Sequence, residues 1–395
     1  MTSTSCKDIA RETLELCLAG REPAQLPVEL ARDECGEALF GTLIEGLADR
    51  FEPRLCGAYA RLFSQAVALR AEGVTAAELV ARYERVRRVR PIESVPRRVF
   101  VLSRVTLGAD IAITSVLLAA AKKNWPEAEI VFVGPRKNFE LFAGDARLRH
   151  AEVNYARGNL RERLAVWQEL QRLLDAPDAV TLDPDTRLTQ LGLLPVCAEE
   201  RYRLFESRAY GAETGFALPE LAAGWAAETL GVVAAKPYLA LRERSAHPGC
   251  IAVSLGVGAN PGKRLADPFE EELLRLLART GAPLVVDKGA GGEEALRVEQ
   301  AVARSAVRAD FWKGSFAGFA AIIAGSRLYA GYDSAGQHVA AACGVPLVSI
   351  FAGFPSPRMF ERWRPVGGYC RVIRVDTPDA GAALSRVREA LDQLR

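Results

Sequence analysis

The sequence predicts an α/β protein with two successive domains of parallel sheet and helix, preceded by an all-helical segment. From Arg98 onward, short apolar runs alternate with helix-like stretches, which is the pattern of parallel sheets covered on both faces. Polar or glycine-rich loops follow several of these runs, whereas the first 95 residues have almost no strand signal. We therefore expect a helical extension at 1–95, a first α/β domain at 96–235 and a second at 236–395.

Composition and charge narrow the class of protein. The chain has 395 residues, of which 49% are hydrophobic and 25% charged, enough for two or three domains with a sizeable core. No window approaches 18 consecutive apolar residues and the N-terminus has no signal-peptide pattern, so we expect a cytoplasmic protein without a spanning helix. A net charge of +2 argues against bulk nucleic-acid binding.

The eight cysteines show no C-x-x-C spacing, which argues against a metal or redox motif. We expect them to be reduced and mostly buried, as small hydrophobic residues in a reducing compartment. They are Cys6, Cys17, Cys35, Cys56, Cys197, Cys250, Cys343 and Cys370.

The helical extension has amphipathic spacing, for example at Leu39, Leu43 and Leu47, and a capping box at Thr75–Glu78. Self-association, contact with a protein partner and docking against the rest of the chain all remain open as its role. An arginine-rich run at 82–98 would suit an anionic lipid surface or an anionic acceptor, but a solvated helix end and linker is the favoured interpretation.

The first α/β domain opens with a buried strand, Val99–Ser103, followed by a loop that contains Asp110 and a helix through Ala121. Ligands of open α/β sheets bind beyond the carboxyl ends of the strands, so this loop is a candidate site. Asp110 has two interpretations: an N-cap bonded to backbone donors, or a general base at the mouth of a cleft. The loop by itself favours the cap.

A polar loop at 183–192 follows the strand Ala179–Leu182 and also lies at a carboxyl edge. Arg187 in this loop is a candidate for substrate contact. An ordinary turn that begins at Asp183-Pro explains the loop equally well.

The second α/β domain has a strand, Cys250–Leu255, that ends in a glycine-rich loop before a helix at 268–279. Lys263 and Arg264 in this loop suit a diphosphate, because glycines allow close approach and cations neutralise its charge. The loop is not a Walker A motif, since Arg264 stands where Ser or Thr is required. A solvent-exposed lysine is the alternative for Lys263.

A glycine-rich turn with two acidic residues follows the next strand, Pro283–Asp287. Glu293 or Glu294 could hold the two hydroxyls of a ribose, as acidic residues do at such edges. Both could equally be first-turn glutamates that complement the helix dipole.

The segment from Tyr329 to Phe351 reads as strand, polar turn, helix and strand, a βαβ unit. Its helix would start with free backbone N–H groups that can bind a phosphate. Small residues at the start would let a diphosphate approach, and the polar side chains would add donors. The residues concerned are Asp333, Ser334, Ala335, Gly336, Gln337 and His338. A packed or capping histidine is the alternative for His338.

These six residues in order resemble the signature of the lipopolysaccharide heptosyltransferase family, glycosyltransferase family 9, in which Asp-Ser/Thr-Gly-x-x-His opens the donor-binding helix. Leu107–Asp110 is similar to the family's Leu-Gly-Asp turn, with Ala109 as one additional residue. Lys263 and Arg264 match the family's phosphate-binding lysine and the basic residue after it, with Leu265 in place of a Trp. The resemblance covers residues 98–395.

The resemblance implies the GT-B fold, two Rossmann-like domains facing across a cleft, with the acceptor bound by the first domain and the nucleotide sugar by the second. It implies inverting, metal-independent transfer of a heptose-like sugar or hexose from a nucleotide-diphosphate donor to a glycan or lipopolysaccharide-type acceptor, without a cofactor. Asp110 would deprotonate the acceptor and Lys263 would stabilise the departing diphosphate. Arg187 would be an acceptor-side residue, and peripheral contact with a membrane is left open.

Two other functions remain as alternatives. A non-catalytic binding or scaffold protein of the same fold would account for the additional Ala109, the missing Trp and the helical extension. A nucleotide-sugar epimerase or hydrolase is less favoured, because His338 is the one histidine of the sequence near a glycine-rich edge. None of the three histidines forms an H-x-x-x-H pair, and we expect no metal.

Overall fold

The computed structural model describes residues 5–258, 260–289 and 291–394, and the chain divides into two compact units. Unit 1 consists of Met1–Thr106, Val116–Asn138 and Arg147–Ala235. Unit 2 consists of Leu107–Ser115, Phe139–Ala146 and Lys236–Arg395. Two short segments from the first half of the chain therefore belong with the C-terminal unit, and one of them carries Asp110.

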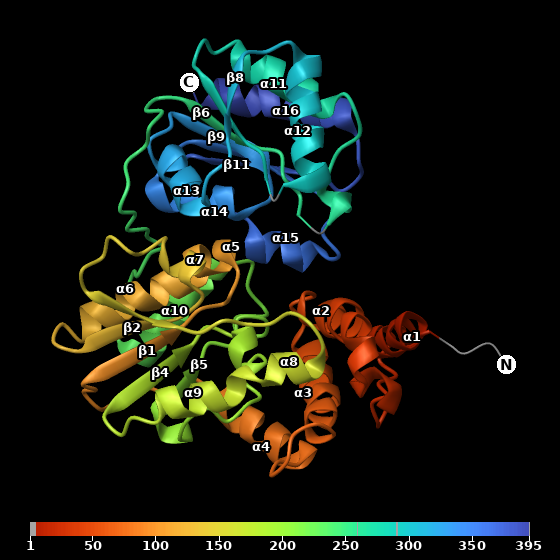
Figure 1. Cartoon of the computed structure of the whole chain (residues 1–395), viewed down its shortest axis with the longest axis vertical. Coiled ribbons are helices and arrows are strands. Elements are labelled where there is room, and N and C mark those ends of the chain that lie inside the picture. The colour runs from red at the N-terminus through yellow and green to blue at the C-terminus, as the bar shows by residue number, and fades with distance from the viewer. Residues whose placement is uncertain (1–4, 259, 290, 395) are drawn as a thin grey trace. The chain divides into compact units, whose positions relative to one another are not determined.

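The sheet of unit 1 is parallel throughout, with the strand order β3-β2-β1-β4-β5 (Figure 1). Its strands are β1 (Arg98–Leu102), β2 (Glu129–Gly134), β3 (Leu148–Glu152), β4 (Ala179–Asp183) and β5 (Tyr202–Leu204). The expected strands Val99–Ser103 and Ala179–Leu182 correspond to β1 and β4, and the apolar run at 130–133, also a strand signal, forms β2; all three strands are buried on both faces. The edge strands β3 and β5 were not predicted, because β3 carries polar residues and β5 has three residues.

Helices precede and surround this sheet. The N-terminal helices are α1 (Cys6–Leu18), α2 (Glu45–Ala48), α3 (Pro53–Ala68) and α4 (Ala76–Val86), together with the 3-10 helices η1 (Val28–Ala31) and η2 (Asp33–Cys35) and the π-helix η3 (Ala38–Ile44). They are followed by α6 (Ser115–Asn124), α7 (Arg136–Phe139), α8 (Leu160–Leu164), α9 (Val166–Leu174), the 3-10 helices η5 (Arg187–Thr189) and η6 (Glu199–Arg201), and α10 (Leu218–Leu230). The predicted capping box begins α4, since the Thr75 and Glu78 side chains each accept the other's backbone N–H.

The helical extension packs against the sheet domain of unit 1. Leu39 and Phe63 belong to the same buried hydrophobic cluster as Phe100 of β1. The Tyr59 hydroxyl donates to the Gln190 carbonyl at 2.7 Å, and Arg82 Nη1 donates to the Gly192 carbonyl at 2.5 Å. Of the roles left open by the sequence, the structure therefore shows docking against the rest of the chain.

Replacement of Phe63 by Ala is expected to destabilise unit 1 by about 3–5 kcal/mol, because the change leaves a cavity in a shared core. Phe63 is fully buried, stacks on Tyr59 with ring centroids 5.5 Å apart, and meets the edge of Phe40 at 5.5 Å. Urea denaturation measures the effect. Phe216→Ala is the control, since Phe216 is 54% exposed, and it should cost less than about 1 kcal/mol. A separate transition for the extension, with the rest of unit 1 unchanged, would contradict the shared core.

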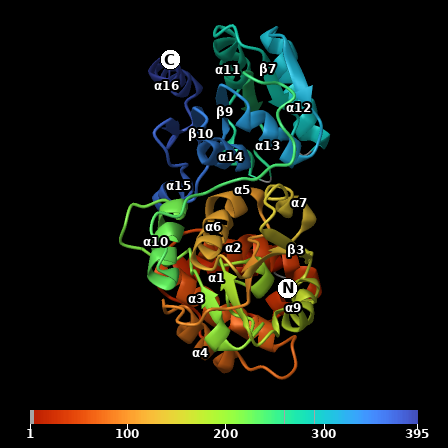
Figure 2. The same cartoon turned by 90° about the vertical axis from the view of Figure 1, so that its left-hand side faces the viewer.

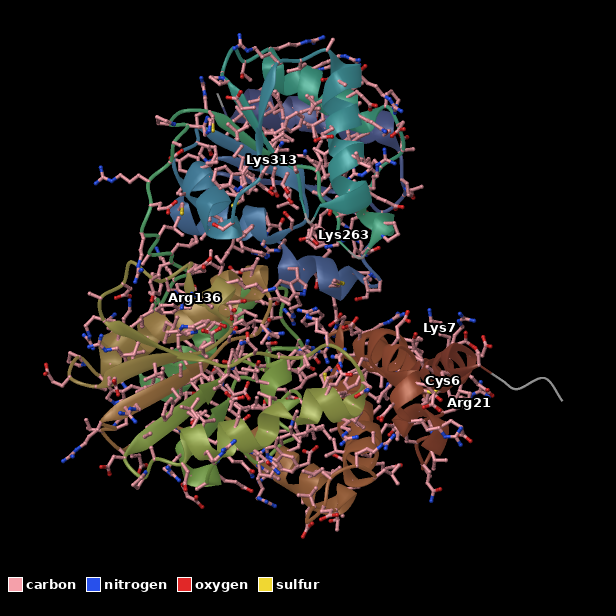
Figure 3. All side chains as sticks on the ribbon, viewed as in Figure 1. Cys6, Lys7, Arg21, Arg136, Lys263 and Lys313 are labelled. Carbon is pink, nitrogen blue, oxygen red and sulfur yellow. A yellow bond between two sulfur atoms is a disulfide. The ribbon has the colours of Figure 1, made fainter. Side chains whose placement is uncertain are left out.

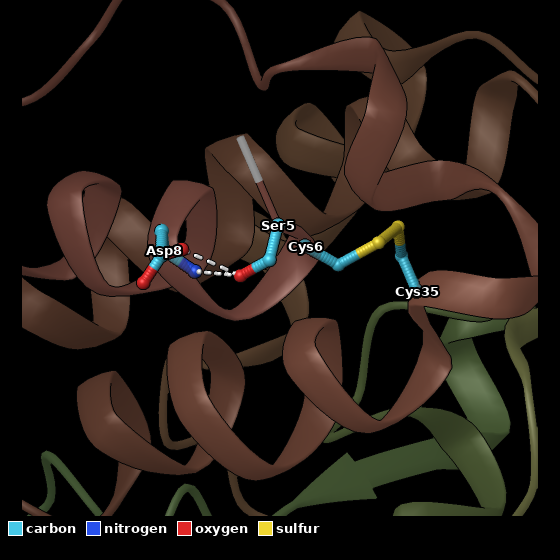
Figure 4. The surroundings of a disulfide bond; sticks show 4 residues. All are labelled: Ser5, Cys6, Asp8 and Cys35. Atoms are coloured by element: carbon cyan, nitrogen blue, oxygen red, sulfur yellow. Dashed lines mark hydrogen bonds between the residues drawn. A yellow bond between two sulfur atoms is a disulfide. The ribbon is translucent and has the colours of Figure 1, made fainter. Parts of the chain in front are cut away.

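A disulfide joins Cys6 of α1 to Cys35 of η2, with Cα atoms 5.4 Å apart (Figure 4). The prediction that all eight cysteines are reduced is therefore wrong for these two. Their separation of 29 residues matches no local motif, and the approach of η2 to α1 is a tertiary contact. Of the other six cysteines, which are free, three are buried.

The sheet of unit 2 is also parallel, with the order β11-β10-β9-β6-β7-β8 (Figures 1 and 2). Its strands are β6 (Ile251–Ser254), β7 (Leu284–Asp287), β8 (Ala309–Trp312), β9 (Leu328–Tyr332), β10 (Leu347–Phe351) and β11 (Cys370–Arg374). The edge strands β8 and β11 were not predicted, again because they carry polar and partly exposed residues.

The helices of unit 2 alternate with its strands. They are α5 (Leu107–Ala109), the π-helical turn η4 (Asp110–Thr114), the 3-10 helix η7 (Pro261–Lys263), α11 (Phe269–Ala278), α12 (Gly292–Ser305), α13 (Phe316–Ala324), α14 (Ala335–Cys343), α15 (Pro357–Trp363) and α16 (Ala380–Gln393). Residues of α11, α12 and α16 form one hydrophobic cluster with the strands. The predicted α/β class is confirmed.

The strand order places a topological switch point in unit 2. Strand β6 pairs with β7 on one side and with β9 on the other. The chain leaves β6 toward β7 and leaves β9 toward β10, so the connections after the neighbouring strands β6 and β9 run in opposite directions along the sheet. Ligands of open parallel sheets bind at the carboxyl ends of such strands. The loop after β6 contains Lys263, and the turn after β9 contains Asp333 and Ser334.

Among the residues that the structure describes, no helix has the length and apolar character needed to cross a bilayer.

Candidate active site

The start of α14 lies directly after β9. Ser334 is the N-cap residue, with an extended backbone at φ −156° and ψ 178°, but its side chain makes no capping bond to the helix. The Ser334 hydroxyl instead lies 3.0 Å from the Tyr329 hydroxyl. A helix start that its own N-cap side chain does not satisfy retains the donors and the positive dipole end that bind anions.

Gly336 is required for the packing of the first turn of α14. A Cβ atom at this position would collide with the ring and hydroxyl of Tyr329, which is fully buried. The sequence interpretation assigned the small residue only to the approach of a diphosphate. The structure adds that Tyr329 lies against this first turn, and sequence reasoning did not identify Tyr329 as a site residue.

Lys263 forms an ion pair with Asp333. Its Nζ lies 2.7 Å from Asp333 Oδ2 and 3.1 Å from the Asp333 carbonyl oxygen, and its side chain is 19% exposed. Figure 3 labels Lys263 among the side chains of unit 2. The turn that carries it is held by Asn260, which accepts from the Gly262 N–H at 3.0 Å and donates to the Gly353 carbonyl at 3.1 Å. The alternative of a solvent-exposed lysine is therefore wrong, and a cation lies at the start of α14.

Gln337 connects the Asp333 carboxylate to two neighbouring elements. Its Nε2 donates to Asp333 Oδ1 and to the Trp363 carbonyl, the latter at 3.3 Å, while its Oε1 accepts from Ser349 Oγ at 2.5 Å. The side chain is fully buried. These contacts make Gln337 a positioning residue for Asp333.

His338 is buried beside Gln337 and Trp363. Its ring meets the Trp363 ring edge-on, with centroids 5.8 Å apart, and its Nε2 lies 3.4 Å from Gln337 Nε2. Burial lowers the pKa of His338 to about 4, Asp333 opposes this shift, and the charge of Lys263 adds to it. The imidazole is therefore neutral at neutral pH and can act there as a hydrogen-bonding group.

Replacement of His338 by Gln is expected to remove part of the acid sensitivity of the protein. The folded-state pKa is about 4 and the ordinary value is 6.5, so the unfolded state binds more protons between these values. The contribution of neutral His338 to stability is complete above pH 6.5 and is lost as pH falls toward 4, by at most about 3 kcal/mol. Denaturation midpoints at pH 7.5 and 4.5 measure this loss. An equal acid loss in wild type and His338→Gln would contradict the assignment.

Asp110 lies inside a helical run, so the N-cap interpretation is wrong. The run begins with α5, Ala109 has helical φ −71° and ψ −35°, and Asp110 opens the π-helical turn η4. The Ser115 N–H donates to the Asp110 carbonyl, five residues earlier. The π turn follows α5 directly and leads into α6, so the helical run continues from Leu107 to Asn124 with Ala109 inside it.

The Asp110 carboxylate is fully buried and accepts a hydrogen bond from Thr114 Oγ1 at 2.6 Å. The segment before it packs on α14: a Cβ at Gly108 would lie 3.2 Å from His338 Cδ2 and 3.3 Å from Ala335 Cα. The structure thus brings the Asp110 segment against the first turn of α14, within unit 2.

Arg264 and Glu294, two of the other charged candidates after β6 and β7, make structural contacts. Arg264 forms ion pairs with Asp267 and with Glu270, the latter at 3.3 Å. Glu294 Oε1 accepts from the Val257 N–H at 2.7 Å and thereby holds the glycine-rich loop. Both side chains are used by the fold, and their described contacts do not include the Lys263–Asp333 pair.

Glu293 and Leu265 complete the positions compared with the family pattern. Glu293 is exposed in the first turn of α12, so its carboxylate is open to solvent. Leu265, which replaces the family's Trp, is 1% exposed in the core of unit 2, and its N–H donates to the Tyr332 hydroxyl at 3.2 Å.

Arg187 lies in unit 1 on η5, where its Nη2 is 3.9 Å from Glu45 Oε1 of the helical extension. The polar loop that contains it is built around Asp183. Asp183 Oδ1 accepts from the Thr186 N–H at 2.8 Å, and Oδ2 accepts from the Thr189 and Tyr202 hydroxyls. These contacts support the interpretation of an ordinary Asp-Pro turn.

Asp287 lies at the carboxyl edge of the unit 2 sheet, and sequence reasoning did not select it. It ends β7, and burial together with the charge of Glu294 raises its pKa to about 6, against a backbone hydrogen bond from Gly289. Its position at the carboxyl end of a buried strand was the available signal. Within the described ranges, no group of three His, Cys, Asp or Glu side chains could hold a metal ion.

Comparison with solved structures identifies the same architecture in sugar transferases. The chain matches the Escherichia coli heptosyltransferase WaaC with ADP-2-deoxy-2-fluoro heptose at 17% identity and a TM-score of 0.55, covering 75% of this chain and 100% of that one. It matches E. coli ADP-heptose lipopolysaccharide heptosyltransferase II at 20% identity and a TM-score of 0.54, covering 75% of this chain and 98% of that one. A family 9 glycosyltransferase from Veillonella parvula matches at 16% identity and a TM-score of 0.59, covering 77% of this chain and 98% of that one.

No protein-family model matches the sequence, and no curated protein matches it. Identities of this size show the fold alone. The parallel sheets of five and six strands and the three structural matches therefore agree with the resemblance read from the sequence. The chain has the GT-B fold of the lipopolysaccharide heptosyltransferases and family 9 glycosyltransferases.

Proposed function

We propose that this protein is an inverting, metal-independent glycosyltransferase that moves a heptose-like sugar or hexose from a nucleotide-diphosphate donor to a glycan or lipopolysaccharide-type acceptor. The observation that carries the proposal is the paired cation, Lys263, at a helix start that lacks a side-chain cap, beside the segment that bears Asp110. Neighbours of the same fold were solved with ADP and with an ADP-heptose analogue, which supports a nucleotide-diphosphate donor.

The donor diphosphate would bind at the first turn of α14. The N–H groups of Ala335 and Gly336 would face its oxygens, and Lys263 would exchange its bond to Asp333 for one to the phosphate. As the bond to the anomeric carbon breaks, negative charge grows on the departing diphosphate, and a fixed cation stabilises that charge most strongly in the transition state. Ser334 and neutral His338 would add hydrogen bonds.

Asp110 would act as the general base that takes the proton from the attacking acceptor hydroxyl. The hydrogen bond from Thr114 orients the carboxylate, and the packing of Gly108 on Ala335 sets the base against the donor helix. On the donor side, Glu293 is the candidate for the ribose hydroxyls because its carboxylate is exposed, whereas Glu294 already holds the loop after β6.

A thermal-shift titration with ADP, GDP, UDP and dTDP, each with Mg²⁺ and with EDTA, tests this function. One diphosphate should raise the melting temperature equally in both conditions, since a ligand stabilises the state to which it binds. Turnover is then tested with sugars of that nucleotide. Absence of a shift with all four would contradict the donor site, and binding without turnover of any sugar would favour the non-catalytic binding protein.

A further inference from the structure

The N-cap residue of α14 differs from the three other serine N-caps in the described ranges. Ser5, Ser315 and Ser356 each accept the backbone N–H three residues ahead, at 3.2, 3.1 and 3.2 Å. Ser334 has the same place at the start of α14, and its side chain makes no such bond. Backbone conformation does not explain the difference, because φ is −154° at Ser356 and −156° at Ser334. A contact of the Ser334 side chain must therefore hold it away from the helix.

Tyr329 provides this contact. Its hydroxyl lies 3.0 Å from Ser334 Oγ, and its side chain is fully buried on β9. Ser254, which ends β6, gives the same hydroxyl a second hydrogen bond. Burial raises the pKa of Tyr329 above its ordinary value, so the hydroxyl keeps its proton at neutral pH and can donate. Tyr329 thereby offers the Ser334 hydroxyl a fixed partner in place of the helix N–H groups.

Gly336 makes room for the Tyr329 hydroxyl. A Cβ atom at position 336 would collide with Tyr329 Oη and would lie 2.6 Å from its Cζ. Any other residue at this position would therefore push the phenol away from the first turn of α14. The glycine admits the hydroxyl, and the hydroxyl holds Ser334, so the three residues form one arrangement.

We propose that Tyr329 is a positioning residue of the donor site, whose hydroxyl holds the Ser334 side chain off the start of α14 and leaves the first-turn N–H groups to the diphosphate. The identity of the ligand rests on the proposed function, whereas the hold on Ser334 does not. Without the Tyr329 hydroxyl, Ser334 would cap the Gln337 N–H. A diphosphate would then have to displace that cap.

Amide hydrogen exchange of the full-length protein, followed by NMR, tests the hold on Ser334. Tyr329→Phe should slow exchange of the Gln337 N–H about fivefold, because the released serine adds a capping bond. Tyr329→Phe/Ser334→Ala should restore the wild-type rate. Loosened packing alone would speed exchange in both variants. An unchanged or faster rate in Tyr329→Phe, or slowing that persists in the double variant, would overturn the proposal.

Isothermal titration with ADP, GDP, UDP and dTDP measures the effect on the donor site. For the diphosphate that binds, Tyr329→Phe should weaken binding about fivefold when Ser334 is present. In the Ser334→Ala background the same change should weaken binding less than about twofold, since no serine remains to form the cap. Equal weakening in both backgrounds would overturn the proposal, because the effect of Tyr329 would not pass through Ser334.

Tyr59→Phe is the matched control. Tyr59 is another buried tyrosine, in unit 1, and its hydroxyl donates to the Gln190 carbonyl at 2.7 Å. Its replacement should leave Gln337 exchange and nucleotide binding within about twofold of wild type. Changes as large as those of Tyr329→Phe would overturn the proposal, since they would show a general effect of a lost buried hydroxyl. Failure of all four diphosphates to bind the wild type would contradict the proposed function, and the exchange rates would still decide the role of Tyr329.

Discussion

Replacement of Asp110 by Asn is expected to lower turnover by about 10²–10⁴-fold and to leave binding of the nucleotide diphosphate unchanged. An amide cannot take a proton from the acceptor hydroxyl. Its carbonyl oxygen can still accept the hydrogen bond from Thr114 Oγ1, which spans 2.6 Å in the wild type, so the packing of the segment should persist. Release of nucleotide diphosphate measures turnover, and the thermal shift with the same nucleotide measures binding.

Asp376→Asn is the control for this change. Asp376 is another carboxylate in unit 2, it pairs with Arg374 at 2.7 Å, and the proposed mechanism gives it no role. Its replacement should change turnover by much less than that of Asp110. Full activity in Asp110→Asn would remove this residue from the mechanism, and a parallel loss of nucleotide binding would show that the substitution had disturbed α14 instead.

Replacement of Lys263 by Met should weaken binding of the nucleotide diphosphate by about 10–100-fold, the loss expected for one charge-assisted hydrogen bond. Turnover should fall further than binding, because the cation acts most strongly on the charge of the departing diphosphate. The thermal shift at saturating nucleotide and the rate of diphosphate release measure the two effects. Unchanged nucleotide binding would contradict the assignment of Lys263 to the donor phosphate.

Two further variants separate ligand binding from folding. Lys263→Met alone leaves the nearly buried Asp333 carboxylate without its cation, so Lys263→Met/Asp333→Asn should recover stability but not binding. Lys288→Met removes another lysine of unit 2, one that pairs with Glu299, and should leave nucleotide binding unchanged. Equal loss of binding in both lysine variants would indicate a general effect on charge.

The elements that the sequence predicted are those whose signal is local. Strand β9 and helix α14 follow from an apolar run, a polar turn and a C-terminal Gly344, and α4 follows from its capping box. Lys263 and Asp333 were assigned to one site because the loops after parallel strands meet at one edge of a sheet. Their ion pair, across 70 residues, agrees with that expectation.

Other features depended on contacts between distant parts of the chain. Glu294 had two interpretations, and Arg264 had one, contact with a diphosphate, until the structure showed the loop N–H and the carboxylates that they contact. The edge strands carry polar residues and acquire their strand conformation from a neighbour in the sheet. Their own residue patterns gave too weak a signal to identify them.

The sequence by itself determined the α/β class, the helical nature of the N-terminal extension and the strand, polar turn and helix around residues 333–338, because periodicity, capping and turn chemistry act within a few residues. The tertiary structure alone decided the Cys6–Cys35 disulfide, the π-helical turn that begins at Asp110 and the docking of the extension on the sheet domain. These features require atoms distant in sequence, or a helix under the constraint of its neighbours, to approach within bonding distance, and that approach is set by packing of the whole chain.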